Sequence, residues 1–113
     1  MFPLDKDLQI IKSNLNEFGE ITIRVLQYLP NVLSNHAEKK DYMNAEKMFL
    51  IVTDLRTDYL DKALFNLAVV QQKQGKRNQC IENLQKALII NPKNQKVQKY
   101  LNRFKGSLGV PAD

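Results

Sequence analysis

Two parts of the chain carry the same apolar pattern, 35 residues apart, and this repeat constrains the fold more than any other feature. In each copy a small residue is followed by a large one and then by a compact one, at steps of four and three. These triplets are Ala45, Phe49 and Val52 in the first copy and Cys80, Leu84 and Ala87 in the second. Steps of three and four bring side chains to one face of an α-helix. The repeat therefore predicts similar helical units, which bury a continuous core by stacking on one another.

Local signals mark where the later helices begin and end. Asp58 and Asp61 have the spacing of an N-cap and a first-turn carboxylate. Gly75 is expected to end the helix that follows, because glycine tolerates the left-handed backbone conformation of a C-terminal cap. Asn91-Pro92 closes the next helix, since proline disfavours a helical residue before it. A last helix, which stops near Gly106, has the apolar stripe Val97, Leu101 and Phe104.

The first half of the chain has a less regular pattern. One helix is indicated by the apolar residues Leu8, Ile11, Leu15 and Phe18, and it ends near Gly19. Another is indicated between Ile21 and Leu33, interrupted or started afresh at Pro30. Leu50 and Ile51 lie off the apolar stripe of the helix after Asp41, so we expect that helix to be covered on two sides. Together these segments predict five or six helices joined by short turns, in an all-α antiparallel array.

Composition agrees with one globular domain. The chain has 113 residues, of which 43% are apolar and 26% charged, and this balance excludes a disordered chain. The longest fully apolar run, Met48 to Val52, is far too short to span a membrane, and no secretory signal is visible. The single cysteine, Cys80, cannot form an internal disulfide, which agrees with a reducing compartment. We therefore predict a cytoplasmic protein with no membrane partner.

The net charge of +5 is unevenly distributed. Residues 1–58 carry 7 basic and 9 acidic side chains, whereas residues 59–113 carry 10 basic and 3 acidic ones. This asymmetry favours an acidic partner for the C-terminal half, or head-to-tail contact between copies of the chain.

One stretch of the sequence carries a family resemblance. It contains Ala63-Leu64-Phe65-Asn66-Leu67-Ala68, Gln74-Gly75, Cys80-Ile81, Leu84, Lys86-Ala87-Leu88 and Asn91-Pro92. Together these residues resemble one complete tetratricopeptide unit, in which small residues let two helices approach closely. Leu64 stands where that family favours tryptophan, and Leu67-Ala68 match its Leu-Gly pair.

The resemblance divides the chain into segments and implies a tetratricopeptide-like superhelix of helix-turn-helix repeats. Residues 61–94 match strongly, and 28–60 match as a degenerate unit in which Thr57 replaces the expected proline. The segments are an N-terminal helical segment at 1–27, the two units at 28–60 and 61–94, a capping helix at 95–106 and a flexible tail at 107–113.

The resemblance also implies a non-catalytic module that binds a peptide in a concave groove. The groove-facing residues it implies are Lys62, Phe65, Asn66, Val69, Gln72 and Lys73, continued by Lys96, Lys99, Tyr100 and Arg103. The weaker first unit would add Gln27, Asn31, Ser34 and Glu38.

The chemistry of this set indicates the kind of peptide. Asn66 and Gln72 can hydrogen-bond a partner's backbone amides, although Asn66 stands at a position common across the family and can equally make a structural hydrogen bond. The lysines and Arg103 would attract carboxylates, and Phe65, Val69 and Tyr100 would bury an apolar anchor. We therefore expect an acidic segment of another protein that carries one apolar anchor.

One subgroup of the family clamps the C-terminal carboxylate of heat-shock chaperones. Asn66 and Lys96 match its clamp, but Tyr100 stands where it has an arginine, and Pro30 or Asn31 stands where it has its first lysine. The clamp is incomplete, which argues against a chaperone tail as the partner.

No pattern indicates an enzyme, a cofactor or a metal site. The only histidine, His36, has no second histidine or nearby cysteine in sequence, and Cys80 stands where a small packing residue is needed. Gly75-Lys76-Arg77 lacks the glycine spacing of a phosphate-binding loop.

Two alternatives to peptide binding stay open. The basic C-terminal half is compatible with nucleic acid, although few aromatic residues are placed to stack on bases. Two units also fall short of the three usually needed for an independent stack, which allows self-assembly or a piece of a longer repeat protein.

Overall fold

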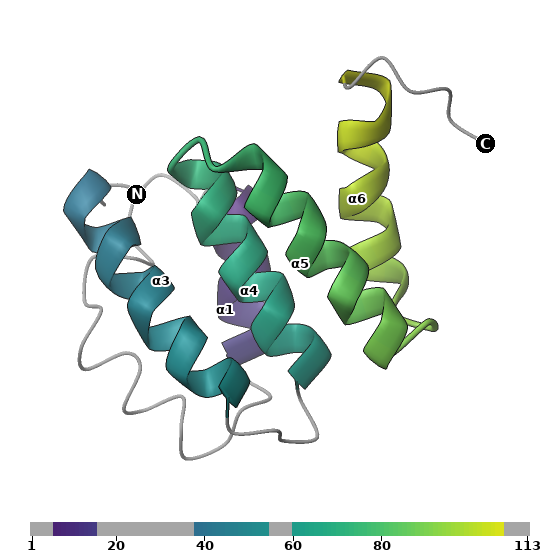
Figure 1. Ribbon diagram of the computed structural model, residues 1–113, viewed down its shortest axis with the longest axis horizontal. Helices are drawn as coiled ribbons and strands as arrows, with labels where there is room; N and C mark the ends of the chain where they lie inside the picture. Colours follow the sequence, from purple (N-terminus) through teal and green to yellow (C-terminus); the bar gives the residue numbers. More distant parts are fainter. Residues whose placement is uncertain (1–5, 16–37, 55–59, 108–113) are drawn as a thin grey trace.

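The computed structural model describes residues 6–15, 38–54 and 60–107, and all regular structure in these ranges is α-helical (Figure 1). With the labels of Figure 1, the helices are α1 (Lys6–Leu15), α3 (Lys39–Asp54), α4 (Leu60–Lys73), α5 (Arg77–Ile90) and α6 (Gln95–Ser107). The expected all-α fold is confirmed.

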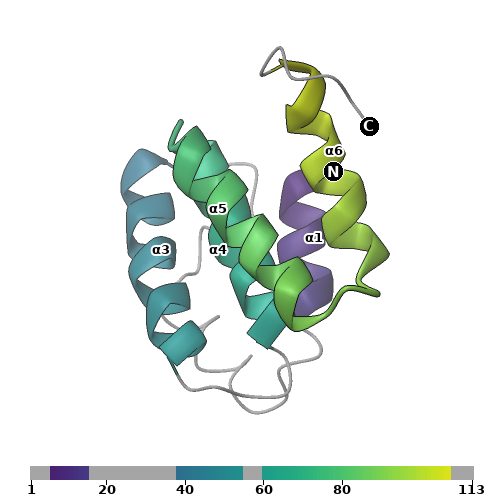
Figure 2. The same cartoon turned by 45° about the vertical axis from the view of Figure 1, so that its right-hand side comes forward.

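Helix α4 lies at the centre of the molecule. It packs against α3, α5 and α1, while α6 packs against α5. Figure 2 shows α1 beside α6, on the side of α4 away from α3. Both triplets of the repeated pattern are buried: Ala45, Phe49, Val52, Cys80, Leu84 and Ala87 all belong to the core, as do Val97, Leu101 and Phe104 of α6. The repeated pattern therefore does mark the packing faces of α3 and α5.

The turn from α4 to α5 depends on Gly75. Its φ is +80°, which is the left-handed conformation expected there. The N–H of Gly75 donates to the carbonyl of Gln72 at 3.0 Å, and the N–H of Lys76 donates to that of Gln71 at 2.9 Å. This pair of bonds is the Schellman motif, which satisfies carbonyls that the end of a helix leaves open. At the other end of α5, the N–H of Asn91 donates to Ala87 at 2.9 Å.

Asp61 joins three helices rather than serving only the first turn of α4. Its buried carboxylate accepts hydrogen bonds from the side-chain amides of Asn91 at 3.1 Å and Asn94 at 2.7 Å. The Asn94 side-chain oxygen in turn accepts the N–H of Val97 at 3.2 Å and so caps α6. The start of α4 is thereby tied to the turn between α5 and α6.

One expectation about α3 is wrong. Leu50 and Ile51 are 46% and 58% exposed, so this helix is not covered on a second side. The reason is that its packing within the described ranges is against α4, through the face that carries Ala45, Phe49 and Val52.

Several expectations lie outside the described residues. They are the second N-terminal helix, Asp58, the groove candidates Gln27, Asn31 and Ser34, His36, and residues 108–113 of the tail. None of the described helices is long and apolar enough to cross a membrane.

Candidate functional site

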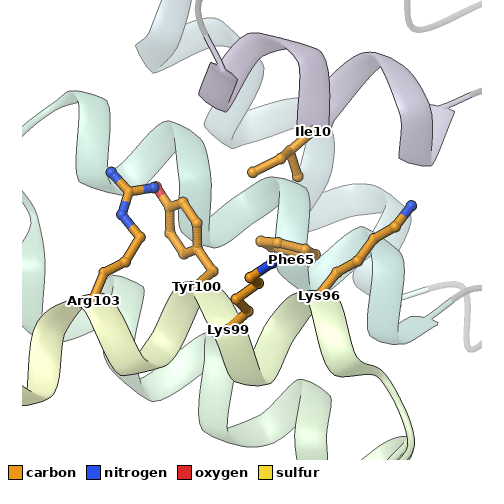
Figure 3. A pocket seen from close by; sticks show the side chains of 6 residues that line it. All are labelled: Ile10, Phe65, Lys96, Lys99, Tyr100 and Arg103. Atoms are coloured by element: carbon orange, nitrogen blue, oxygen red, sulfur yellow. The ribbon is translucent and has the colours of Figure 1, made fainter.

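A cavity of about 670 Å³ lies between α1, α4 and α6, and we call it the groove (Figure 3). Its lining residues are Ile10, Phe65, Lys96, Lys99, Tyr100 and Arg103. All but Ile10 are among the residues implied by the family resemblance, so five of the ten implied in α4 and α6 are brought together here. Ile10 could not be expected from the sequence, because nothing in the pattern of α1 indicates which helix it packs against.

The rings of Phe65 and Tyr100 form the floor of the groove, and Phe104 continues this aromatic row beyond it. Phe65 and Tyr100 meet edge to face with their centroids 5.5 Å apart, and Tyr100 meets Phe104 in the same way at 5.5 Å. All three side chains are buried. Such contacts stabilise packing beyond the area they bury, so these rings also hold α6 against the repeat.

The rim of the groove is basic. Lys96, Lys99 and Arg103 are exposed and follow one another on α6 at steps of three and four, which places them on one face of that helix. The guanidinium carbon of Arg103 lies 4.7 Å from the centroid of the Tyr100 ring. This cation–π contact holds the Arg103 head group next to the aromatic floor. Every charged residue among the described residues that line the groove carries a positive charge.

Asn66 is fully buried beneath α1. Its side-chain oxygen accepts a hydrogen bond from Asn14 at 2.9 Å, and its amide nitrogen donates to the carbonyl of Ile11 at 3.4 Å. Of the two roles open to Asn66, contact with a partner and a structural hydrogen bond, the structure shows the structural one, because both bonds are made within this chain. Helix α1 therefore covers the part of the concave face where Asn66 lies.

The other implied residues are spread more widely. Val69 is buried in the core, whereas Lys62 and Lys73 are half-buried on α4. Gln72 lines a second cavity that adjoins the groove. Glu38 is exposed at the start of α3, where its N–H donates to the Asp41 carboxylate at 2.8 Å.

A buried polar cluster at Glu46 joins α3, α4 and the start of α5. The Glu46 carboxylate accepts hydrogen bonds from Gln71 at 3.0 Å, from Gln74 at 3.2 Å and from the Lys76 ammonium at 2.6 Å. Burial raises the pKa of Glu46, but these hydrogen bonds and the charge of Lys76 outweigh burial and hold the pKa below its ordinary value of 4.5. The sequence does not predict this cluster, because Glu46 on α3 is at least 25 positions away from its partners in α4 and in the turn before α5.

Among the residues that the structure describes, His, Cys, Asp and Glu side chains do not gather in groups of three or more that could hold a metal ion. Cys80 is fully buried and packs as a small apolar residue.

Comparison with known protein families gives a match for part of the chain. The family model of the tetratricopeptide repeat matches residues 61–94, which comprise nearly all of α4, the whole of α5 and the turn that follows. Searches of curated proteins and of solved structures found no significant match. Repeats of this family generally mediate protein–protein interactions. The match and the helix pair that it covers identify residues 61–94 as a unit of the tetratricopeptide repeat family.

Proposed function

We propose that this chain is a non-catalytic interaction module whose groove binds an acidic segment of another protein. The observation that carries the proposal is the composition of the groove, which combines an apolar floor with a rim whose described ionisable residues are all basic. An apolar side chain of the segment would enter between Ile10, Phe65 and Tyr100. Its carboxylates would then lie near Lys96, Lys99 and Arg103.

The bound segment would run along α6 rather than over the whole concave face. Helix α1 already covers Asn66, and the cavity beside it is walled on one side by Ile10 and on the other by α6. In this arrangement α1 is one wall of the binding site. The remaining implied residues, Lys62, Val69 and Lys73, then contribute to folding or to the general positive charge rather than to direct contact.

The test uses a labelled peptide with a central leucine flanked on both sides by aspartate and glutamate, titrated with the full chain. Lys99→Glu is expected to weaken binding by about ten-fold or more, because it puts a carboxylate on the rim of the groove. Lys93→Glu makes the same charge change at an exposed residue of the turn before α6 that does not line the groove, and is the matched control. Equal effects of the two variants, or no binding by the wild type, would contradict the proposal.

A nucleic-acid partner predicts a different result in the same assay. Single-stranded DNA would then bind with a steep dependence on salt, and the acidic peptide would not compete with it.

A second candidate function is self-assembly, favoured by an apolar surface on α3 and α5. Leu50, Ile51, Ile89 and Ile90 are exposed there, and a cavity of about 380 Å³ lies beside the two isoleucines of α5. A cytoplasmic location stays a prediction under both candidates.

A further inference from the structure

The groove continues into a second cavity at the end of the molecule where α4 turns into α5. This cavity has a volume of about 400 Å³ and is lined by Gln72, Gly75, Arg77, Arg103 and Phe104. Because Arg103 lines both cavities, they adjoin one another. A segment that lies in the groove can therefore extend past Arg103 towards Arg77.

Two arginines of this cavity are held by neighbouring rings of the aromatic row. The guanidinium carbon of Arg77 lies 5.8 Å from the centroid of Phe104, and that of Arg103 lies 4.7 Å from the centroid of Tyr100. The two rings are themselves in contact, with centroids 5.5 Å apart. A guanidinium that rests on the face of a ring keeps its N–H donors in its own plane, where they can bind both oxygens of a carboxylate.

The turn at Gly75 separates Arg77 from its basic neighbour. The Lys76 ammonium bonds the Glu46 carboxylate at 2.6 Å, on the side of α3, whereas Arg77 lies against Phe104 of α6. Lys76 is therefore engaged in packing the helices together. Arg77 and Arg103 are the described ionisable residues that line the second cavity, and both are basic.

We propose that Arg77 and Arg103 form a carboxylate-binding subsite for an aspartate or glutamate side chain of the segment in the groove. The inference rests on the proposed function, and it adds on which side of the apolar anchor the acidic residues of the segment lie. Acidic residues on the Arg77 side of the apolar anchor meet two guanidinium groups, whereas those on the opposite side approach Lys96. Since an arginine can bind a carboxylate through two parallel hydrogen bonds and a lysine cannot, the module prefers segments whose acidic residues lie on one side of the anchor.

The experiment compares two labelled peptides of identical composition, one with its acidic residues before a single leucine and one with them after it. The wild-type chain is expected to prefer one of them. Arg77→Gln should weaken the binding of the preferred peptide by about ten-fold and that of the other peptide by less than about two-fold. Arg77→Lys should also weaken the preferred peptide, because it keeps the charge but loses the paired hydrogen bonds. The matched control, Lys93→Gln, should leave the preference intact.

Two results would overturn the subsite. One is a preference that survives in Arg77→Gln, and the other is an equal loss for both peptides in Arg77→Gln and Lys93→Gln, which general electrostatic attraction would produce.

If neither peptide binds the wild type, the proposed function fails, and the subsite is tested on its own. Acetate is titrated into the full chain at constant ionic strength, and the backbone amide NMR signals are followed. Saturable shifts at Gly75 and Arg77 that vanish in Arg77→Gln support the subsite. Shifts that persist in that variant, or no saturable shift in the wild type, refute it.

Discussion

Glu46 shows how a single carboxylate can hold three helices in register. It lies on α3, and its partners are Gln71 near the end of α4, Gln74 in the turn and Lys76 just before α5. The amide of Asn83 extends the cluster by donating to the side-chain oxygen of Gln71 at 2.7 Å. A buried carboxylate is costly unless its oxygens are bonded, and here both oxygens accept hydrogen bonds.

Replacing this carboxylate should destabilise the fold in a pH-dependent way. At pH 7, Glu46→Gln is expected to lower the free energy of unfolding by about 1–2 kcal/mol, because it removes the charge that Lys76 binds. Folding lowers the pKa of Glu46, so its contribution is complete above 4.5 and is lost as the pH falls through the lowered pKa of the folded state. The difference between variant and wild type should therefore shrink in acid, as measured by urea unfolding at several pH values.

The control for this prediction is Glu82→Gln. Glu82 pairs with Lys86 at 3.5 Å on the exposed face of α5, and both side chains are more than half exposed. Exposed pairs of this kind contribute little, so the control should change the free energy of unfolding by less than about 0.5 kcal/mol. A difference between Glu46→Gln and wild type that stays constant down to strongly acidic pH would contradict the assigned role of Glu46.

Single residues also mark the limit of what the sequence predicts. Helical spacing and the family resemblance assign Phe65, Asn66 and Val69 to one face of α4. Neither reveals that all three are buried, because their burial depends on the elements that cover this face, including α1 and α6. For this reason Phe65→Ala is unsuitable as a test of binding, since removing a fully buried ring destabilises the fold itself.

At the scale of helices, α1 is attached to the repeat by a small set of contacts. Ile11 is fully buried, and Asn14 is bonded to Asn66 of α4. Gln9 and Lys12 are exposed, and Ile10 and Ser13 are half-buried. Because the apolar face of α1 is short, polar contacts contribute much to keeping this helix on α4. Asn66 makes two of them, with the Asn14 side chain and with the carbonyl of Ile11.

Asn66→Ala should loosen α1 more than any other described helix. The substitution leaves the buried amide of Asn14 without the oxygen that accepts its hydrogen bond and removes the contact with the Ile11 carbonyl, at a cost of about 1–3 kcal/mol. We expect faster hydrogen exchange at the amides of α1, while the protection of α4 and α5 changes little. Binding of the acidic peptide should fall as well, since α1 supplies one wall of the groove.

The matched variant for this experiment is Asn102→Ala. Asn102 accepts a hydrogen bond from Gln98 at 3.0 Å on the exposed face of α6, so its loss should leave exchange in α1 unchanged. Unchanged exchange in Asn66→Ala would show that α1 does not depend on this contact. Tighter peptide binding in Asn66→Ala would show that α1 competes with the peptide instead of forming a wall.

The ends of helices were predictable, whereas the position of α1 was not. Gly75 and Asn91-Pro92 act on the backbone within a few residues, so their effect can be read from the sequence. Asn14 and Asn66, by contrast, are 52 positions apart. Asparagine is also a residue type that is mostly exposed in proteins, so nothing in the sequence marks these two as buried. A long-range polar contact of this kind leaves no periodic signal.

At the scale of the whole molecule, the two sides of the helix stack have different chemistry. One side carries the groove and the basic face of α6. The other carries the apolar surface that includes Leu50 of α3 and, on α5, Ile89, which is 80% exposed. Thr53 near the end of α3 and Ile89 and Ile90 at the end of α5 line one cavity. We expect the exposed apolar residues of both helices to form one surface around this cavity, and a contiguous apolar surface is typical of protein contact sites.

Self-assembly through this surface makes a prediction that is independent of the groove. Under it, light scattering should give an average mass that rises above 13.1 kDa with concentration, and Ile89→Glu should restore the monomer because a carboxylate is costly to bury. Gln79→Glu adds the same charge at the other, exposed end of α5 and should leave the association intact. If the average mass of the wild type stays at 13.1 kDa over the accessible concentrations, self-assembly is excluded. The apolar surface would then be expected to contact a different protein. Because Ile89 lies away from the groove, Ile89→Glu should bind the acidic peptide as the wild type does, so the two candidate functions can be separated by one variant.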